Sequence, residues 1–148
     1  MLSISGSYGK TVIKEWINFI AEEKLNINRS PKSYNSQFGA ALTILSIREN
    51  HQLAIVETGI SKPGEMSLMK KMIQPSHAIL SNIGSEHLEN FSSIDELRIE
   101  KEKILENTYF TYFKDYKQLD TKRTITENGQ EIKWIYNKKN ETFFLRQK

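Results

Sequence analysis

The residues best suited to chemistry lie at the start of the chain, in Ser5-Gly6-Ser7-Tyr8-Gly9-Lys10-Thr11. A triphosphate site needs backbone N–H groups that close around phosphate oxygens, and glycine permits that close approach. It also needs an ammonium that reaches the outer phosphates and a hydroxyl that holds Mg²⁺. These groups are supplied here by Gly6, Gly9, Lys10 and Thr11.

The surroundings of this stretch favour phosphate binding. The longer phosphate-loop pattern G-x-x-x-x-G-K-[ST] is not met, because its first glycine would fall at Ile4. The shorter G-x-x-G-K-T over residues 6–11 also occurs as a plain glycine turn before a surface lysine. However, a strand-like run, Met1–Ile4, precedes it and an amphipathic helix follows. The positive N-terminal end of that helix would point at a bound anion.

Two further polar residues follow apolar runs that resemble buried strands. Glu57 comes after Leu53–Val56, where a carboxylate can hold Mg²⁺ between a nucleotide and a substrate. The alternative is a solvated loop glutamate, and the presence of Lys10 and Thr11 favours the metal role. His87 follows the run 78–80 and is a candidate second metal ligand, although a lone loop histidine is more often structural or exposed.

Lys101 is the most informative residue outside the loop. A helical projection of residues 94–105 places Ile94, Leu97, Ile104 and Leu105 on one face with Lys101 in its middle. A lysine that reaches out to solvent from the stripe would explain this pattern. An inward lysine, made neutral enough by burial to react with CO₂ and form a carbamate, would explain it equally well.

Strands and helices alternate over the first two thirds of the chain, which predicts an α/β fold: a P-loop-type parallel sheet flanked by helices. Expected strands are 1–4, 26–28, 53–56 and 78–80. Expected helices are 12–20, 37–48, 65–73 and 93–106. Because ligands bind at the carboxyl ends of parallel strands, the Gly6 loop, Glu57 and residues 81–87 should meet at one edge.

The apolar spacing also predicts which helix faces are buried. The first helix is expected to pack on the sheet through Val12, Ile13, Trp16, Ile17 and Ile20, with Lys14 on its opposite side. The second helix is expected to bury Phe38, Ala41, Leu42 and Leu45.

The pattern changes after residue 108. An aromatic cluster, 109–116, precedes two strand-like runs that flank Asn128-Gly129, a strong hairpin signal. A third strand over 142–145 would complete a C-terminal antiparallel β-meander. We therefore divide the chain into a core, 1–108, and an aromatic-rich meander segment of the same domain, 109–148.

Composition excludes several classes of protein. The 148 residues include no cysteine, so disulfides and thiolate metal sites are excluded. No signal peptide or membrane-length apolar run is visible, which fits a cytoplasmic protein with no membrane partner. Residues 107–148 carry 9 basic against 5 acidic residues. We interpret this excess as a solvated face rather than a nucleic-acid site, because the lysines lie beside ordinary strand patterns.

Taken together, the motifs resemble the central ATPase domain of the Mur ligases. The resemblance rests on Ser5–Thr11, Glu57-Thr58-Gly59, the segment 82–89 and Lys101. Within that family the similarity is greatest to the branch that joins D-alanyl-D-alanine to UDP-N-acetylmuramoyl-tripeptide. The stretches 29–39 and 59–66 resemble the form fused to alanine racemase in Bacteroidetes-type bacteria. Tyr8 stands where the family usually has asparagine.

The resemblance implies an ATP-dependent amide ligase of peptidoglycan precursor synthesis. ATP would phosphorylate the tripeptide carboxylate to an acyl phosphate, which the amine of D-alanyl-D-alanine attacks. Lys10 would hold the β- and γ-phosphates, Thr11 and Glu57 one Mg²⁺, and His87 and carbamylated Lys101 a second. Asn35 and Ser36 would line the substrate and metal side.

The chain is short for such an enzyme. The family's N-terminal UDP-binding domain and C-terminal ligase domain are expected to be absent. The chain would then be a fragment, a truncated reading frame or one piece of a split enzyme, and in the last case another chain would supply the missing domains. The fragment alone is expected to be inactive in ligation. Alternatives are a ligase resembling folylpolyglutamate synthase, or a non-catalytic nucleotide-binding module.

Overall fold

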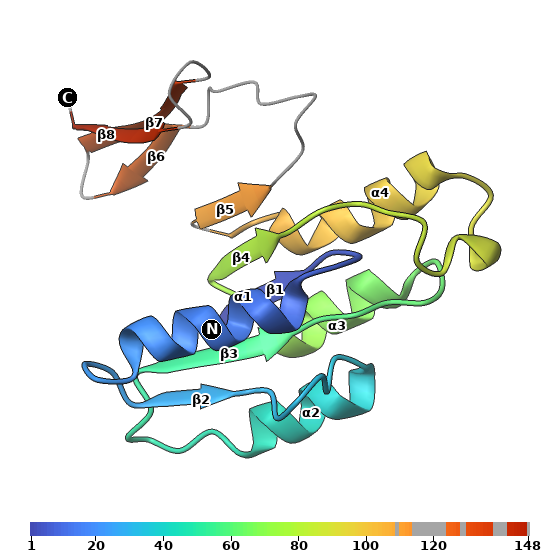
Figure 1. Ribbon diagram of the computed structural model, residues 1–148, viewed down its shortest axis with the longest axis horizontal. Helices are drawn as coiled ribbons and strands as arrows, with labels where there is room; N and C mark the ends of the chain where they lie inside the picture. The colour runs from blue at the N-terminus through green and yellow to red at the C-terminus, as the bar shows by residue number, and fades with distance from the viewer. Residues whose placement is uncertain (109, 114–123, 128–129, 138–141, 148) are drawn as a thin grey trace. The chain divides into compact units, whose positions relative to one another are not determined.

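The computed structural model describes residues 1–108, 110–113, 124–127, 130–137 and 142–147. These divide into two compact units, Met1–Lys114 and Asp115–Lys148. Figure 1 shows the order of the elements along the chain. In the described parts, no helix is both long and apolar enough to cross a membrane.

The first unit is built on a parallel sheet whose strands lie in the order β2-β3-β1-β4-β5. The strands are β1 (Leu2–Ser5), β2 (Ile27–Arg29), β3 (Leu53–Glu57), β4 (His77–Leu80) and β5 (Phe110–Phe113). The predicted α/β class and parallel sheet are confirmed. The strand β5 was not expected, since residues 110–113 were identified only as part of an aromatic cluster. The compact unit extends to Lys114, beyond the expected core boundary at residue 108.

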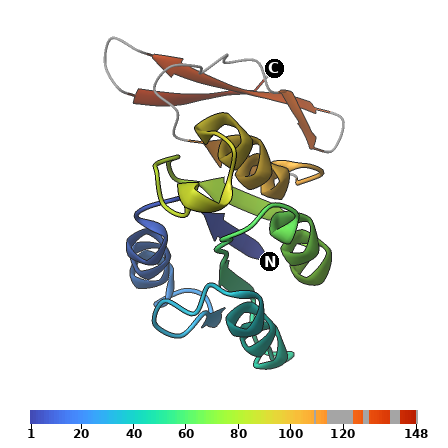
Figure 2. The same cartoon turned by 90° about the vertical axis from the view of Figure 1, so that its right-hand side faces the viewer.

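Helices cover both faces of this sheet. They are α1 (Lys10–Ala21), α2 (Gln37–Leu45), α3 (Glu65–Ile73) and α4 (Ile94–Glu102), with short 3₁₀ turns η1 (Leu88–Asn90) and η2 (Lys103–Leu105). The connection from β1 to β2 runs toward the β2 edge of the sheet. The connections from β2 to β3 and from β3 to β4 run in the opposite direction. Right-handed crossovers of opposite direction place their helices on opposite faces. Figure 2 accordingly shows α1 on one face and α2 and α3 on the other.

The main apolar core lies between the sheet and the layer of α2, α3 and α4. All nine residues of α3 were predicted correctly, and its Met66, Met69 and Ile73 are fully buried. The other buried members of this apolar cluster are Ala40, Val56, Ile60, Ala78, Leu80, Phe91, Leu97, Ile104 and Leu105. Ser93 caps α4 by accepting a hydrogen bond from the Glu96 N–H, which fixes where that helix begins.

The predicted buried face of α1 is wrong. Trp16 is 68% exposed, and Val12 and Ile20 are exposed with it. The buried positions are instead Lys10, Lys14 and Asn18. Lys10 points into the phosphate loop, and this sets the rotation of the helix about its axis. Because residues four and eight positions later lie on the same helix face, Lys14 and Asn18 also face the sheet. Ile13 and Ile17 flank that polar line and are half-buried.

The predicted buried face of α2 is also wrong. Phe38 is 74% exposed and Leu45 75%, with Leu42 at 40%. The buried residues are Gly39, Ala40 and Thr43. A Cβ at Gly39 would lie 2.9 Å from the Tyr34 backbone, so the helix approaches its own preceding loop too closely for a larger residue on that side. The helix also ends at Leu45, three residues before the predicted end.

The second unit contains β6 (Thr124–Glu127), β7 (Gln130–Asn137) and β8 (Thr142–Gln147). β6 pairs antiparallel with β7, and β7 pairs antiparallel with β8. The expected Asn128-Gly129 turn lies outside the described residues, as do Tyr109 and Tyr116 of the aromatic cluster.

Candidate nucleotide and metal site

Three segments that are far apart in sequence meet at the carboxyl edge of the sheet. Strand β1 pairs with both β3 and β4, so Ile4 lies beside Glu57 and Ser5 beside Leu80. The loops that leave these strands therefore start next to one another. The predicted meeting of the Gly6 loop, Glu57 and residues 81–87 is confirmed.

The phosphate loop turns sharply at two glycines. Gly6 has φ 134°, and Gly9, with φ 81°, precedes the first residue of α1. A Cβ at Gly6 would lie 2.0 Å from the Ser81 Oγ. Both positions therefore favour glycine because of their positive φ angles, and Gly6 requires it also because a side chain would collide with Ser81. The N-terminus of α1 opens directly behind this turn, which suits an anion.

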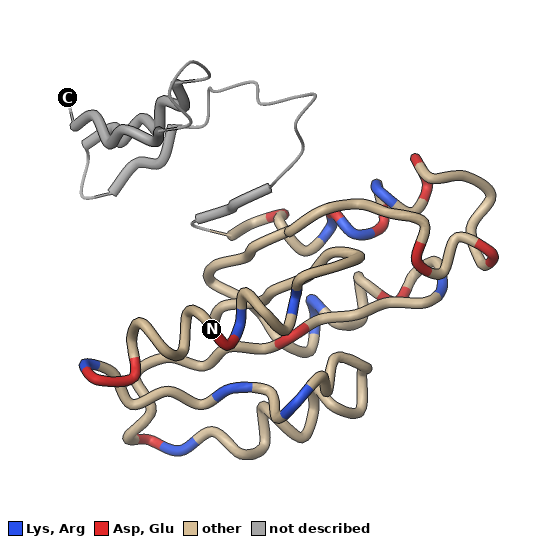
Figure 3. The backbone as a smooth tube through the Cα atoms, in the orientation of Figure 1, with Lys and Arg blue, Asp and Glu red and all other residues tan. Residues whose placement is uncertain are grey.

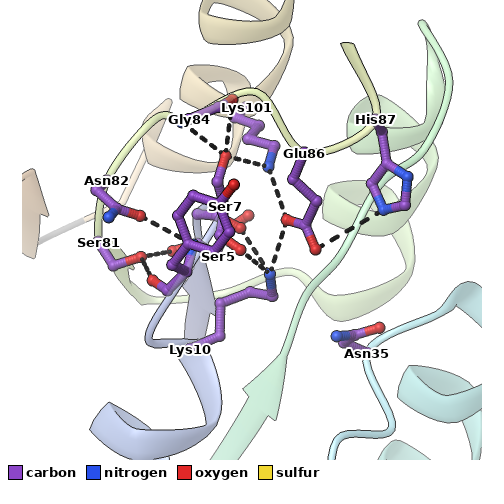
Figure 4. A network of polar contacts seen from close by, with 12 residues as sticks. Ser5, Ser7, Lys10, Asn35, Ser81, Asn82, Gly84, Glu86, His87 and Lys101 are labelled. Atoms are coloured by element: carbon purple, nitrogen blue, oxygen red, sulfur yellow. Dashed lines mark hydrogen bonds and ion pairs between the residues drawn. The ribbon is translucent and has the colours of Figure 1, made fainter. Parts of the chain in front are cut away.

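The loop after β4 holds the phosphate loop in place. The Ser7 N–H donates to the Asn82 carbonyl at 2.8 Å, and the Tyr8 N–H donates to the Asn82 Oδ1 at 2.9 Å. The Ser81 hydroxyl donates to the Tyr8 carbonyl at 2.7 Å. Figure 4 shows this set of contacts. Sequence reasoning missed Ser81 and Asn82 as positioning residues, because only the β1–β4 pairing brings them to the loop.

Lys10 is buried within the site. Its Nζ donates to the Gly6 carbonyl at 2.8 Å and the Ser7 carbonyl at 3.1 Å. It also lies 3.4 Å from a carboxylate oxygen of Glu86. The ammonium thus lies in the curve of the loop, where the outer phosphates of a nucleotide would be.

Lys101 points inward, which is the side-chain direction that the second of its two sequence interpretations requires, while its carbamylation stays a prediction. It is 1% exposed, and its Nζ donates to the Ser7 Oγ at 3.1 Å. Burial of its amine, followed by the Lys10 ammonium, lowers the pKa of Lys101 to about 8, against the opposing effect of Glu86. A substantial share of this amine is therefore neutral near pH 8, which is the reactive form.

Glu86 lies between the two lysines and was missed by sequence reasoning. Its Oε2 is 3.4 Å from the Lys10 Nζ and 3.7 Å from the Lys101 Nζ, as Figure 4 shows. The neighbouring His87, with φ 61°, has its Nε2 3.8 Å from the Glu86 Oε1. The signal in the sequence was the position of Glu86 beside His87 at a strand end.

Glu57 and Thr11 lie together at the opposite side of the site. Glu57 is 1% exposed, and the Thr11 hydroxyl lies 2.9 and 3.0 Å from its two carboxylate oxygens. The Asn35 Nδ2 donates to the Glu57 Oε1 at 3.1 Å. The structure thus brings three of the predicted site residues into one cluster.

The ligand roles of all the predicted site residues stay predictions. Ser36 caps α2, where its Oγ accepts a hydrogen bond from the Gly39 N–H at 3.2 Å. In the described residues, no three His, Asp or Glu side chains form a ready metal cluster. A metal at His87 and Lys101 would therefore need the Lys101 carbamate as well.

Lys14 is the largest omission of the sequence-based prediction. It is fully buried, and its Nζ lies 3.4 Å from the Glu57 Oε2. Figure 3 shows basic (blue) positions on α1 and an acidic (red) position at the end of β3, two segments that the Lys14–Glu57 ion pair joins. The spacing carried a signal: a residue four positions after Lys10 lies on the same helix face.

Known proteins resemble the chain over most of its length. The Mur ligase middle domain matches residues 4–147. The UDP-N-acetylmuramoyl-tripeptide–D-alanyl-D-alanine ligase of Borreliella burgdorferi is 34% identical over 104 residues, which are 70% of this chain and 22% of that protein. The ligase of the same name from Buchnera aphidicola (strain Bp) is 31% identical over 150 residues, 97% of this chain and 32% of that protein.

Solved structures share the fold. MurF from Acinetobacter baumannii superposes with a TM-score of 0.71 at 20% identity, over 97% of this chain and 37% of that one. MurF ligase from Thermotoga maritima, in complex with ADP, gives a TM-score of 0.70 at 23% identity, over 99% and 39% of the two chains. The chain thus spans between a fifth and two fifths of the length of these proteins. It belongs to the Mur ligase family, whose middle domain it matches.

Proposed function

We propose that this chain is the ATP-binding part of an ATP-dependent ligase that joins D-alanyl-D-alanine to UDP-N-acetylmuramoyl-tripeptide in peptidoglycan precursor synthesis. The observation that carries the proposal is the meeting of the Lys10 loop with the Thr11–Glu57 pair at one sheet edge. The names of the relatives and the ADP complex of the Thermotoga maritima protein support the reaction and the nucleotide. Such precursor chemistry places the protein in the cytoplasm.

The residues present fit ATP and Mg²⁺. The turn at Gly9 places the N-terminus of α1 where it can face an anion, and Lys10 adds a positive charge. Thr11 and Glu57 offer a hydroxyl and a carboxylate oxygen, which are ligands that Mg²⁺ prefers. ATP would supply the phosphoryl group that activates the tripeptide carboxylate. The chain's own residues would hold the nucleotide, orient it and balance its charge.

Lys101 supplies the second half of the proposal. Its neutral amine attacks CO₂ to form an N–C bond and releases one proton, which leaves a carbamate with two oxygens. With His87, that group would hold a second Mg²⁺. The inward position of Lys101 and its lowered pKa support this role. Asn35, which already contacts Glu57, and Ser36 would face the tripeptide substrate.

Ligation itself requires more than these residues. The two relatives are about three times as long as this chain, which aligns with 22% and 32% of them. We expect the isolated chain to bind nucleotide without ligating. The UDP-binding and amine-delivering domains would come from the same polypeptide or from another chain.

Calorimetry with ADP and Mg²⁺ tests the proposal. The wild-type chain should bind ADP·Mg²⁺, and Lys10→Ala should weaken binding at least about tenfold because the ammonium facing the phosphates is lost. Lys24→Ala, an exposed lysine near the far end of α1, is the matched control and should bind like wild type. A folded wild type that binds no ADP, or a Lys10→Ala variant that binds normally, would contradict the assignment.

A further inference from the structure

Lys14 is a fully buried lysine to which the proposed function gives no role. Its Nζ donates to the Ser30 carbonyl at 2.9 Å and to the Lys32 carbonyl. It also forms ion pairs with Glu57 at 3.4 Å and Glu15 at 3.2 Å. Two backbone carbonyls thus accept hydrogen bonds from the ammonium group, and two carboxylates balance its charge. Burying a charged lysine costs free energy unless its charge is compensated. The set of partners around Lys14 therefore points to a specific role.

Among the side chains that contact the Glu57 carboxylate, Lys14 is the one that solvent does not reach. Thr11 is only half-buried, and Asn35 belongs to the exposed loop before α2. Under the proposed function, both would also contact ligands and so exchange partners during binding. Lys14 is 0% exposed and lies behind the carboxylate, so it can stay paired with Glu57 throughout.

Lys14 also fixes the loop that carries Asn35. The two carbonyls that it binds, those of Ser30 and Lys32, lie at the start of this loop. Lys32 has φ 51°, an uncommon angle for a residue with a side chain, and the hydrogen bond of its carbonyl helps to hold that turn. Within the loop, Ser30 also accepts the Glu57 N–H on its Oγ at 3.0 Å. One ammonium therefore connects α1, the end of β3 and the loop.

We propose that Lys14 is a positioning residue for the magnesium site: it holds the Glu57 carboxylate beside Thr11 and fixes the Asn35 loop against it. The inference rests on the proposed function, because it takes Glu57 as a Mg²⁺ ligand. It assigns Lys14 no contact with nucleotide. The consequence is specific: loss of Lys14 should impair the contribution of Mg²⁺ to nucleotide binding rather than nucleotide binding as such.

A double-mutant cycle tests the pairing without any ligand. The chains are wild type, Lys14→Met, Glu57→Gln and the double variant, with Lys24→Met as the exposed-lysine control. Hydrogen exchange of β1 and β3 amides reports the stability of the first unit alone. Lys14→Met should raise the opening constant at least about 100-fold, because Glu57 becomes a buried charge without its partner. The double variant should recover at least about tenfold of that loss.

ADP affinity, measured with Mg²⁺ and with EDTA, tests the link to the metal. The Mg²⁺ ratio is the ADP affinity measured with Mg²⁺ divided by the ADP affinity measured in EDTA. It should exceed 1 in wild type and in Lys24→Met, and fall toward 1 in Lys14→Met and Glu57→Gln. The ADP affinity measured in EDTA should stay within about twofold of the wild-type value in these variants. The double variant should show no further loss of the ratio beyond Glu57→Gln, because Lys14 would then have no carboxylate to position.

Each outcome decides a different claim. An unchanged Mg²⁺ ratio in Lys14→Met, or an equal loss of affinity in EDTA, would overturn the positioning role. If Lys14→Met does not fold but the double variant does, the pairing is supported, and a Mg²⁺ ratio in the double variant below that of Glu57→Gln would then overturn the positioning role. If neither folds, Lys14 is needed for more than Glu57 and the proposal fails. A wild type that binds no ADP would overturn the proposed function, while the exchange cycle would still decide the pairing.

Discussion

Two lysines of the site are buried to the same extent, but their surroundings differ. Lys14 lies against the fully buried Glu57 and two backbone carbonyls. Lys101 has the Ser7 hydroxyl at 3.1 Å and Glu86, whose side chain is one-third exposed, at 3.7 Å. Burial and the nearby Lys10 ammonium lower the pKa of Lys101 to about 8.

The difference teaches how one fold uses buried lysine in two ways. Where carboxylate and carbonyl oxygens surround the ammonium, the charge is balanced and the side chain can hold its neighbours in place. Where burial is less fully compensated and another positive charge is near, the pKa falls and a larger share of the amine is neutral, which the proposed carbamate at Lys101 would require. Both environments lie at the carboxyl edge of one sheet, on opposite sides of the phosphate loop.

The largest expected effect is on stability, at the Glu57 side. Lys14→Met should lower the free energy of unfolding of the first unit by about 3–5 kcal/mol, because it leaves the buried Glu57 carboxylate unpaired. Hydrogen exchange of β3 amides at pH 7 measures the change. A loss below about 1 kcal/mol would mean that the two lysine environments are energetically alike, and the comparison would fail.

The second prediction concerns pH and Lys101. Its folded-state pKa of about 8 lies below the ordinary 10.5, so the unfolded chain binds more protons between these values. Wild-type stability should therefore gain a contribution as pH rises from about 8 to 10.5. Lys101→Met lacks that gain: it should be more stable than wild type by about 2–3 kcal/mol at pH 7, an advantage that shrinks toward pH 10. Parallel exchange or urea series at both pH values would show this, and a constant difference would contradict it.

The third prediction concerns the carboxylate beside Lys101. Glu86→Gln should lower the pKa of Lys101 further below about 8, because Glu86 favours the charged amine. The shift should be under about one unit, as expected for a partly exposed partner. NMR titration of labelled lysine side chains measures it. Glu89→Gln, on an exposed residue 4.0 Å from His87, is the control and should leave the titration unchanged.

The smallest effect is expected where the phosphate loop meets the loop after β4. A Cβ at Gly84 would lie 2.5 Å from the Tyr8 Cε2, but the Tyr8 ring is 55% exposed and can move. Gly84→Ala should therefore cost less than about 1 kcal/mol, and adding Tyr8→Ala should remove the cost. Exchange rates of the Ser7 and Gly84 amides report it. A cost that persists without the Tyr8 ring would show that the backbone, not the ring, resists the change.

The sequence by itself determined the order of elements and the chemistry of the edge. Short apolar runs followed by glycine or acidic residues located β1, β3 and β4, because strands buried on both faces require continuous apolar residues. The same runs showed that the Gly6 loop, Glu57 and residues 81–87 would share one edge. Apolar spacing also placed Lys101 within a stripe, although it left the direction of its side chain open.

Only the tertiary structure decided which groups face one another. The apolar stripes of α1 and α2 predicted the wrong buried faces, because the direction of Lys10 turns α1 and the close approach of Gly39 to Tyr34 limits α2. Pairing of β1 with β3 brings Glu57 to Thr11, where the turn of α1 adds Lys14. Such contacts join residues dozens of positions apart, and the spacing of residues along one segment carries no information about them.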